Sequence, residues 1–96
     1  MAFDQMKMLN QLRKAQKDLE KEIIEVEAGD GMVVVQVDAT LKIKNIKIDP
    51  ALVDLDDISD LEHNVKIAMR DGLAKAQEVA AEKMKPFMGG LGNLGL

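Results

Sequence analysis

The chain has 96 residues, with 13 Lys and Arg against 17 Asp and Glu, and it contains no cysteine, tryptophan or tyrosine. This length supports one domain with a modest core. The absence of cysteine excludes disulfides and thiol chemistry. Because His63 is the single histidine, a zinc site or a Ser-His-Asp triad is disfavoured. We therefore expect a protein that is not an enzyme, with no catalytic residues, metal, cofactor or small-molecule substrate.

The sequence also gives expectations about location. No run of 18 apolar residues is present, so no membrane span or membrane partner is expected. The first residues lack the apolar core of a signal peptide, which predicts a cytoplasmic protein. The net charge of −4 argues against nucleic acid when taken alone, but the charges are segregated. Residues 1–17 carry four bases and one acid, whereas residues 49–62 carry six acids and no base, so a local positive surface is possible.

Residues 4–26 have the periodicity of one long amphipathic helix, with Leu9, Leu12 and Leu19 on a shared stripe. At 1.5 Å per residue this helix would reach about 35 Å, which exceeds what a small core needs. Its N-terminal turns are therefore expected to project from the body or to pack on a partner. Apolar and acidic residues also alternate in residues 23–28, so a first strand is the alternative there.

Residues 29–50 form the stretch that most strongly indicates β-structure. In the expected central strand, Val33, Val35 and Val37 share the face that should meet the helices. The opposite face holds Met32, Val34 and Gln36 and is mostly apolar, so we expect a partner to cover it, which favours a homodimer.

The next expected strand carries Leu41 and Ile43 on one parity and Ile46 and Ile48 on the other. A β-bulge near Lys44 and Asn45 would bring both pairs to one face.

Residues 58–84 have the pattern of a second long helix, which Pro86 is expected to end. Small residues recur every four positions along it, at Ala68, Gly72, Ala76 and Ala80, and such a row allows close backbone packing. The resulting fold class is α+β, with the order α-β-β-β-α and a small antiparallel three-stranded sheet between two long helices. We expect one domain over residues 1–88 and a flexible Gly- and Leu-rich tail over residues 89–96.

Basic residues gather on the first helix and recur elsewhere, and each group has two interpretations. The first-helix group is a solvated face with local pairs, such as Lys14 with Asp18, or it is a strip that contacts phosphates. The lysines of the third strand protect an edge strand or assist in phosphate contact. The candidates are, on the first helix, Lys7, Arg13, Lys14, Lys17 and Lys21; on the third strand, Lys42, Lys44 and Lys47; and on the last helix, Arg70 and Lys75.

The ordered set of motifs resembles the YbaB/EbfC family of bacterial nucleoid-associated proteins. The resemblance covers essentially the whole chain and rests on residues 12–17, 31–38, 46–50 and 82–84, with the Gly-Gly-Leu tail. It implies the α-β-β-β-α fold, a tweezer-shaped homodimer, DNA as the ligand, and the nucleoid as the location. The chain departs from the family at Ala39, where a glycine is usual in the turn after the central strand.

The resulting hypothesis is a homodimer that binds double-stranded DNA, mainly through phosphates, in nucleoid organisation or gene regulation. The family resemblance supplies DNA binding, and the basic residues supply the surface. Single-stranded DNA is disfavoured, because the two aromatic residues, Phe3 and Phe87, lie near the chain ends and offer little stacking surface. The alternative is an acidic helical module for protein–protein interaction, supported by the net acidity, the seven methionines and the row of small residues.

Overall fold

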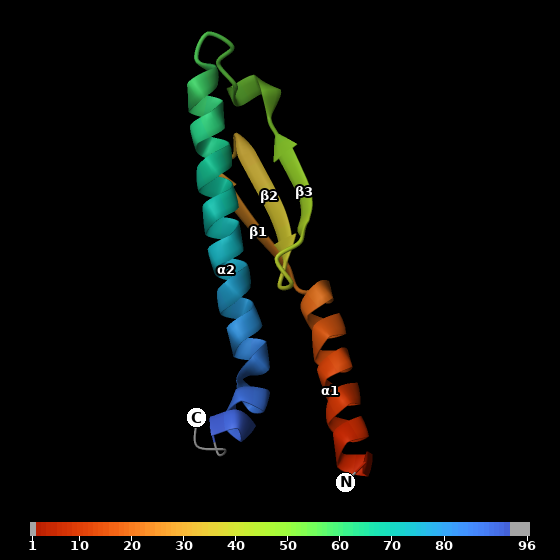
Figure 1. The fold of residues 1–96 in the computed structure, drawn as a ribbon. Coiled ribbons are helices and arrows are strands. Elements are labelled where there is room, and N and C mark those ends of the chain that lie inside the picture. Colours follow the sequence, from red (N-terminus) through yellow and green to blue (C-terminus); the bar gives the residue numbers. More distant parts are fainter. Residues whose placement is uncertain (1, 93–96) are drawn as a thin grey trace.

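The computed structural model describes residues 2–92 of the chain, and the side chains of residues 5–86. Two long helices flank three consecutive strands, as Figure 1 shows, and this order confirms the expected α-β-β-β-α fold class. The elements are α1 (Ala2–Lys21), β1 (Ile23–Ala28), β2 (Val33–Asp38), β3 (Ile43–Ile48), the short 3₁₀ helix η1 (Pro50–Leu52) and α2 (Ile58–Gly92).

The first helix ends five residues earlier than its apolar stripe predicts. The amide of Glu22 donates to the carbonyl of Leu19 at 3.2 Å, and β1 begins at Ile23. From there the backbone pairs with β2, from Ile23 opposite Asp38 to Ala28 opposite Val33. The extension of the helix to residue 26 was therefore wrong, and the strand alternative was correct. Sheet pairing and the burial of one side of this β-branched segment outweigh its helical spacing.

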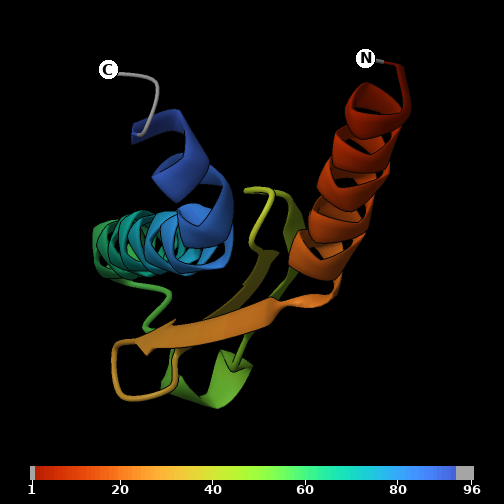
Figure 2. The same cartoon turned by 90° about the horizontal axis from the view of Figure 1, so that it is seen from below.

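The sheet is antiparallel with the order β1-β2-β3, so β2 is central, as predicted. Val33, Val35 and Val37 are fully buried and form the core with Ala68 and Ala76 of α2. Figure 2 shows α2 lying over one face of the sheet. The prediction that the valine face meets a helix is confirmed.

The row of small residues on α2 is the surface that packs on the sheet. Ala68 and Ala76 are fully buried, and Gly72 between them is also buried. A β-carbon at Gly72 would lie 3.1 Å from Cγ2 of Val26, tighter than an ordinary van der Waals contact. The row therefore serves packing within the chain, which removes one of the three supports for the protein–protein interaction module.

We expect Gly72→Leu to lower the free energy of unfolding, because overpacking a filled core costs about 1–3 kcal/mol. Replacing a helical glycine gains about 1 kcal/mol in helix propensity, so the expected net loss is up to about 2 kcal/mol. Chemical denaturation measures the difference. Ala74→Leu on the exposed side of the same helix is the matched control and should leave stability nearly unchanged. Equal effects of the two substitutions would contradict the packing role of Gly72.

The expected bulge lies in β3. Asn45 pairs with Gln36 and Ile43 pairs with Val37, so Lys44 is the extra residue between them. Because Ile46 and Ile48 pair with Val35 and Val33, the bulge brings Ile43, Ile46 and Ile48 to the same side of the sheet as the buried valines. The predicted register shift is confirmed.

The opposite side of the sheet is polar, which corrects the expectation of a second apolar face. Glu25 and Glu27 of β1 lie on this side beside Gln36 and Val34, and Asn45 and Lys47 of β3 extend it. The amide of Gln36 donates to Glu25 at 2.8 Å. The prediction drew on the side chains of the central strand alone, whereas its neighbours supply charged side chains on this face.

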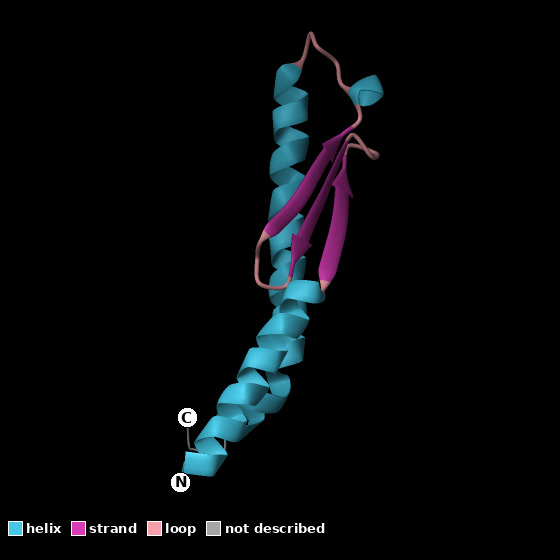
Figure 3. Ribbon diagram, turned by 90° about the vertical axis from the view of Figure 1, so that its right-hand side faces the viewer, coloured by secondary structure: helices cyan, strands magenta, loops and turns pink. Residues whose placement is uncertain are grey.

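Both helices extend beyond the same end of the sheet, as Figures 1 and 3 show from two directions. The molecule is correspondingly long, with extents of 65 × 24 × 15 Å. We call the two projecting parts, α1 and the part of α2 that follows Ala76, the arms. The prediction that the first helix projects from the body is confirmed.

Pro86 lies inside α2, so the prediction that it ends the helix was wrong. A proline removes one backbone hydrogen bond and clashes with the preceding turn, which kinks a helix without necessarily ending it. Figure 1 shows the axis bending near the C-terminal end of α2. Residues 93–96 of the expected tail lie outside the described residues, and the flexibility of that tail stays a prediction. Within the described part, no helix is long and apolar enough to span a membrane.

Candidate nucleic-acid interface

Five basic side chains of α1 form one exposed strip, which we call the basic strip. At 3.6 residues per turn they project within about a third of the helix circumference. All five are exposed, and none makes an ion pair with another described side chain. The expected local pair of Lys14 with Asp18 is therefore not formed among the described contacts. The basic strip consists of Lys7, Arg13, Lys14, Lys17 and Lys21.

The apolar side of α1 fixes the direction in which the basic strip points. Leu12 and Leu19 line a shallow hollow together with Thr40 of the β2–β3 turn and Met84 of α2. Leucines at positions 12 and 19 project roughly opposite to Lys17 on a helix of this geometry. The basic strip is consequently turned away from the β2–β3 turn, toward solvent.

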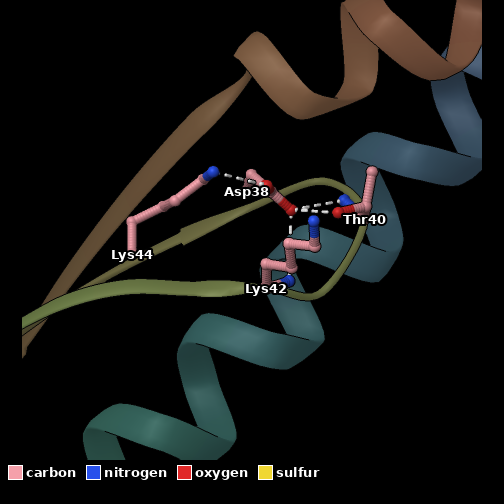
Figure 4. A network of polar contacts seen from close by, with 4 residues as sticks. All are labelled: Asp38, Thr40, Lys42 and Lys44. Atoms are coloured by element: carbon pink, nitrogen blue, oxygen red, sulfur yellow. Dashed lines mark hydrogen bonds and ion pairs between the residues drawn. The ribbon is translucent and has the colours of Figure 1, made fainter.

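A buried carboxylate organises the turn that anchors α1. Asp38 is fully buried, and its Oδ1 accepts hydrogen bonds from the amide of Thr40 at 2.8 Å, from the Thr40 hydroxyl and from the amide of Lys42 at 3.1 Å. Figure 4 shows these contacts around the turn. The next amide, of Ala39, donates to the carbonyl of Leu19 at 3.1 Å. The turn and the C-terminal end of α1 are thus joined through consecutive residues.

The second oxygen of Asp38 makes no hydrogen bond, but Nζ of Lys44 lies 3.3 Å from it and supplies a charge partner. Burial alone would raise the pKa of Asp38. The hydrogen bonds from Thr40 and Lys42, together with Lys44, outweigh this effect and hold the pKa below its ordinary value of 3.8. The carboxylate is therefore ionised in the folded protein at neutral pH.

This environment predicts a loss of stability in acid. Because the folded-state pKa of Asp38 is lowered, its contribution is fully present above the ordinary value of 3.8 and is lost as the pH falls through the folded-state pKa. We expect Asp38→Asn to lower the free energy of unfolding at pH 7 by about 1–3 kcal/mol, since buried donors lose a charged acceptor. Chemical denaturation at pH 7 and at several values below 3.8 measures both effects. If the difference in free energy of unfolding between wild type and Asp38→Asn does not become smaller in acid, this account is contradicted.

The other predicted cations are not gathered with the basic strip. Lys44 is held by Asp38, and its position in the bulge gives it a structural contact. Arg70 pairs with Asp71 at 3.2 Å and Lys75 with Glu78 at 3.5 Å, on the part of α2 that packs on the sheet. Two further candidates, Lys42 and Lys47, are exposed near or on β3.

Lys83, a cation of the α2 arm, was not among the predicted site residues. Nζ of Lys83 on α2 lies 3.1 Å from Oε1 of Glu22, the residue between α1 and β1. These residues are far apart in the sequence, and no local spacing rule connects them. The sequence pattern of α2 shows a lysine near its C-terminal end but does not indicate that this lysine pairs with Glu22.

One exposed group of acidic residues lies at the end of the molecule remote from the arms. Asp54, Asp56 and Asp57 are exposed in the connection that precedes α2, at the opposite end from the N-terminus of α1 in Figure 1. Because like charges repel a polyanion, this acidic end of the molecule is unsuited to contact with DNA.

Comparison with solved structures supports the architecture. An uncharacterized protein of Helicobacter pylori, HP0035, superposes with a TM-score of 0.75 at 21% identity, covering 91% of this chain and 89% of that one. The fold and the exposed strip together define a small two-armed α+β protein with a cationic arm.

The sequence comparisons identify the family. The model of the YbaB/EbfC DNA-binding family matches residues 2–91. Proteins named nucleoid-associated protein are similar over most of their length: one from Rhodococcus opacus (strain B4) is 40% identical, covering 93% of this chain and 79% of the relative. One from Dictyoglomus thermophilum is 40% identical, covering 93% of this chain and 89% of the relative. One from Chloroflexus aurantiacus is 37% identical, covering 91% of this chain and 87% of the relative. The chain belongs to the YbaB/EbfC DNA-binding family, which confirms the resemblance and makes DNA its class of ligand.

Proposed function

We propose that this protein is a non-enzymatic, nucleoid-associated homodimer that binds double-stranded DNA through phosphate contacts from its arms. It would act in the cytoplasm, in nucleoid organisation or gene regulation. The observation that carries this proposal is the basic strip in a chain of a DNA-binding family. Five exposed cations on one arm, without ion pairs to other described side chains, are available to phosphates.

Lysine-rich contacts of this kind favour backbone binding over base reading. Phosphate contacts position a protein on the duplex but carry little sequence information. The strip contains one arginine, Arg13, and four lysines, which act as mobile point charges. We therefore propose weak sequence preference and strong salt dependence.

The homodimer is supported by an apolar surface that the single chain leaves open. Ile43, Ile46 and Ile48 lie on the helix side of the sheet but are 47%, 43% and 45% exposed. Because α2 packs over β1 and β2, this side of β3 lacks a comparable cover. Leu41 of the β2–β3 turn and Leu52 of η1 are also exposed, at 43% and 45%.

A second copy is the occupant that completes this surface. Stacked sheets lie about 10 Å apart, a spacing that the apolar side chains of two facing sheets fill. A two-fold axis parallel to the strands would stack β3 on the partner's β3 and would place each α2 beside the other chain's edge strand. The same axis would direct the arms of both copies toward one end. Burying the exposed part of each isoleucine is worth on the order of 1 kcal/mol, so the patch supports association.

A comparison of duplex and single-stranded DNA of identical sequence tests this function. Fluorescence anisotropy at low salt should show tighter binding to the duplex, because the side chains of residues 5–86 offer charge and include no Phe, Tyr or Trp ring for base stacking. Tighter binding to the single strand would contradict the proposed preference.

A further inference from the structure

The ion pair between Glu22 and Lys83 differs from two other ion pairs of α2. Lys75 pairs with Glu78 and Lys85 with Glu82, both one turn away on the same helix. Among the described ion pairs, that of Lys83 is the one that connects α2 to the end of α1, at an Nζ to Oε1 distance of 3.1 Å. Its carboxylate partner therefore lies at the joint between the basic arm and the sheet.

A groove runs between the two arms beside this pair. Four residues of α1 and two of α2 line it, and each arm contributes one cation to the groove, Lys14 from α1 and Lys83 from α2. Asp18 is the acidic side chain of the lining, and Glu22 is held by Lys83. The full lining is Gln11, Lys14, Ala15, Asp18, Lys83 and Pro86.

We propose that this groove is a phosphate site in which Lys83 joins the basic strip, and that Glu22 competes with the phosphate for Lys83. The inference rests on the proposed function. A DNA phosphodiester entering between Lys14 and Lys83 displaces the Glu22 carboxylate and takes its place on the ammonium. Glu22 thereby limits the affinity of the arms.

The exposure of the pair permits this exchange. The side chains of Lys83 and Glu22 are 48% and 42% exposed, so water and ions reach both. Exposed ion pairs contribute little to stability, and salt screens them. A phosphate close to both lysines gains two attractive contacts against one repulsion from Asp18, whereas the carboxylate of Glu22 has one attractive contact. The contacts of the phosphate therefore offset the free energy lost when the ion pair between Glu22 and Lys83 breaks.

Opposite effects of two substitutions provide the test. We expect Glu22→Gln to tighten duplex binding by about 2- to 5-fold, because it removes the competitor without removing the cation. Lys83→Gln should weaken binding by a similar factor and reduce the slope of log K against log salt by about one per site. In the double variant the gain from Glu22→Gln should vanish, since Glu22 acts through Lys83.

Glu27→Gln and Lys66→Gln change the same charges at exposed positions outside the groove and serve as matched controls. Anisotropy titrations with one random-sequence duplex, at several salt concentrations, measure all variants. If Glu22→Gln and Lys83→Gln both weaken duplex binding, the ion pair only braces the two arms, and the inference is overturned. The inference is also overturned if Glu22→Gln still raises duplex affinity in the double variant, or if Glu27→Gln raises it equally. Failure of the unmodified protein to bind the duplex would instead overturn the proposed function, and the inference with it.

Discussion

Replacing three lysines of the basic strip with glutamate, as Lys14→Glu, Lys17→Glu and Lys21→Glu together, should weaken duplex binding by at least about 100-fold, or roughly 2.8 kcal/mol. Each reversal removes a phosphate contact and adds a repulsive charge, and a dimer carries every change twice. All three side chains are exposed and make no ion pair with a described residue, so folding should be unaffected. Anisotropy at fixed salt measures the affinity, and thermal melting checks the fold.

The effect must come from the position of the charges and not from their sum. Lys17→Glu and Lys66→Glu change the net charge equally, but Lys66 lies on α2 outside the basic strip and the groove. We expect the first to weaken binding strongly and the second only slightly. Equal losses would show that the strip has no special role, and an unchanged affinity of the triple variant would exclude α1 as the contact surface.

Placing a charge on the open side of β3 should dissociate the dimer. Ile46→Glu changes a side chain that is 43% exposed in the single chain, so the chain should still fold. In the stacked dimer the same carboxylate would be buried without a partner, which costs several kcal/mol. Light scattering should give twice the 10.6 kDa chain mass for the wild type and the single mass for the variant.

Loss of the dimer should also lower DNA affinity, because the two linked basic strips of a dimer gain from effective concentration and the single strip of a monomer does not. Asn45→Glu is the matched control, since it introduces the same charge one residue away on the polar side of the sheet. That control should keep the dimer mass. A dimeric Ile46→Glu variant, or a monomeric wild type, would show that this surface does not hold two copies together.

Local patterns of the sequence predicted much of the fold. The valine run predicted the buried strand, and the parity change of Ile43 against Ile46 predicted the bulge at Lys44. The row of small residues predicted the close packing at Gly72. In each case the signal lies within one element, where periodicity determines which side chains share a face.

Features that depend on neighbouring elements were harder to predict. The second side of β2 looked apolar by itself, but Glu25 and Glu27 of β1 make that side of the sheet polar. The basic strip was visible because a helix gathers its own residues. The pairing of Lys44 with Asp38 depends on the bulge, and that of Lys83 with Glu22 on the approach of two helices. Neither follows from sequence spacing.

The salt dependence of duplex binding tests the central claim most directly. A dimer that presents five strip cations on each of two arms should release counterions in proportion to its phosphate contacts. If six to ten phosphates are contacted, affinity should fall by about 10³–10⁵ between 50 and 200 mM salt, with little difference between unrelated duplex sequences. Absence of binding at micromolar protein and low salt, or affinity that hardly changes with salt, would contradict phosphate contact by the arms as the basis of function.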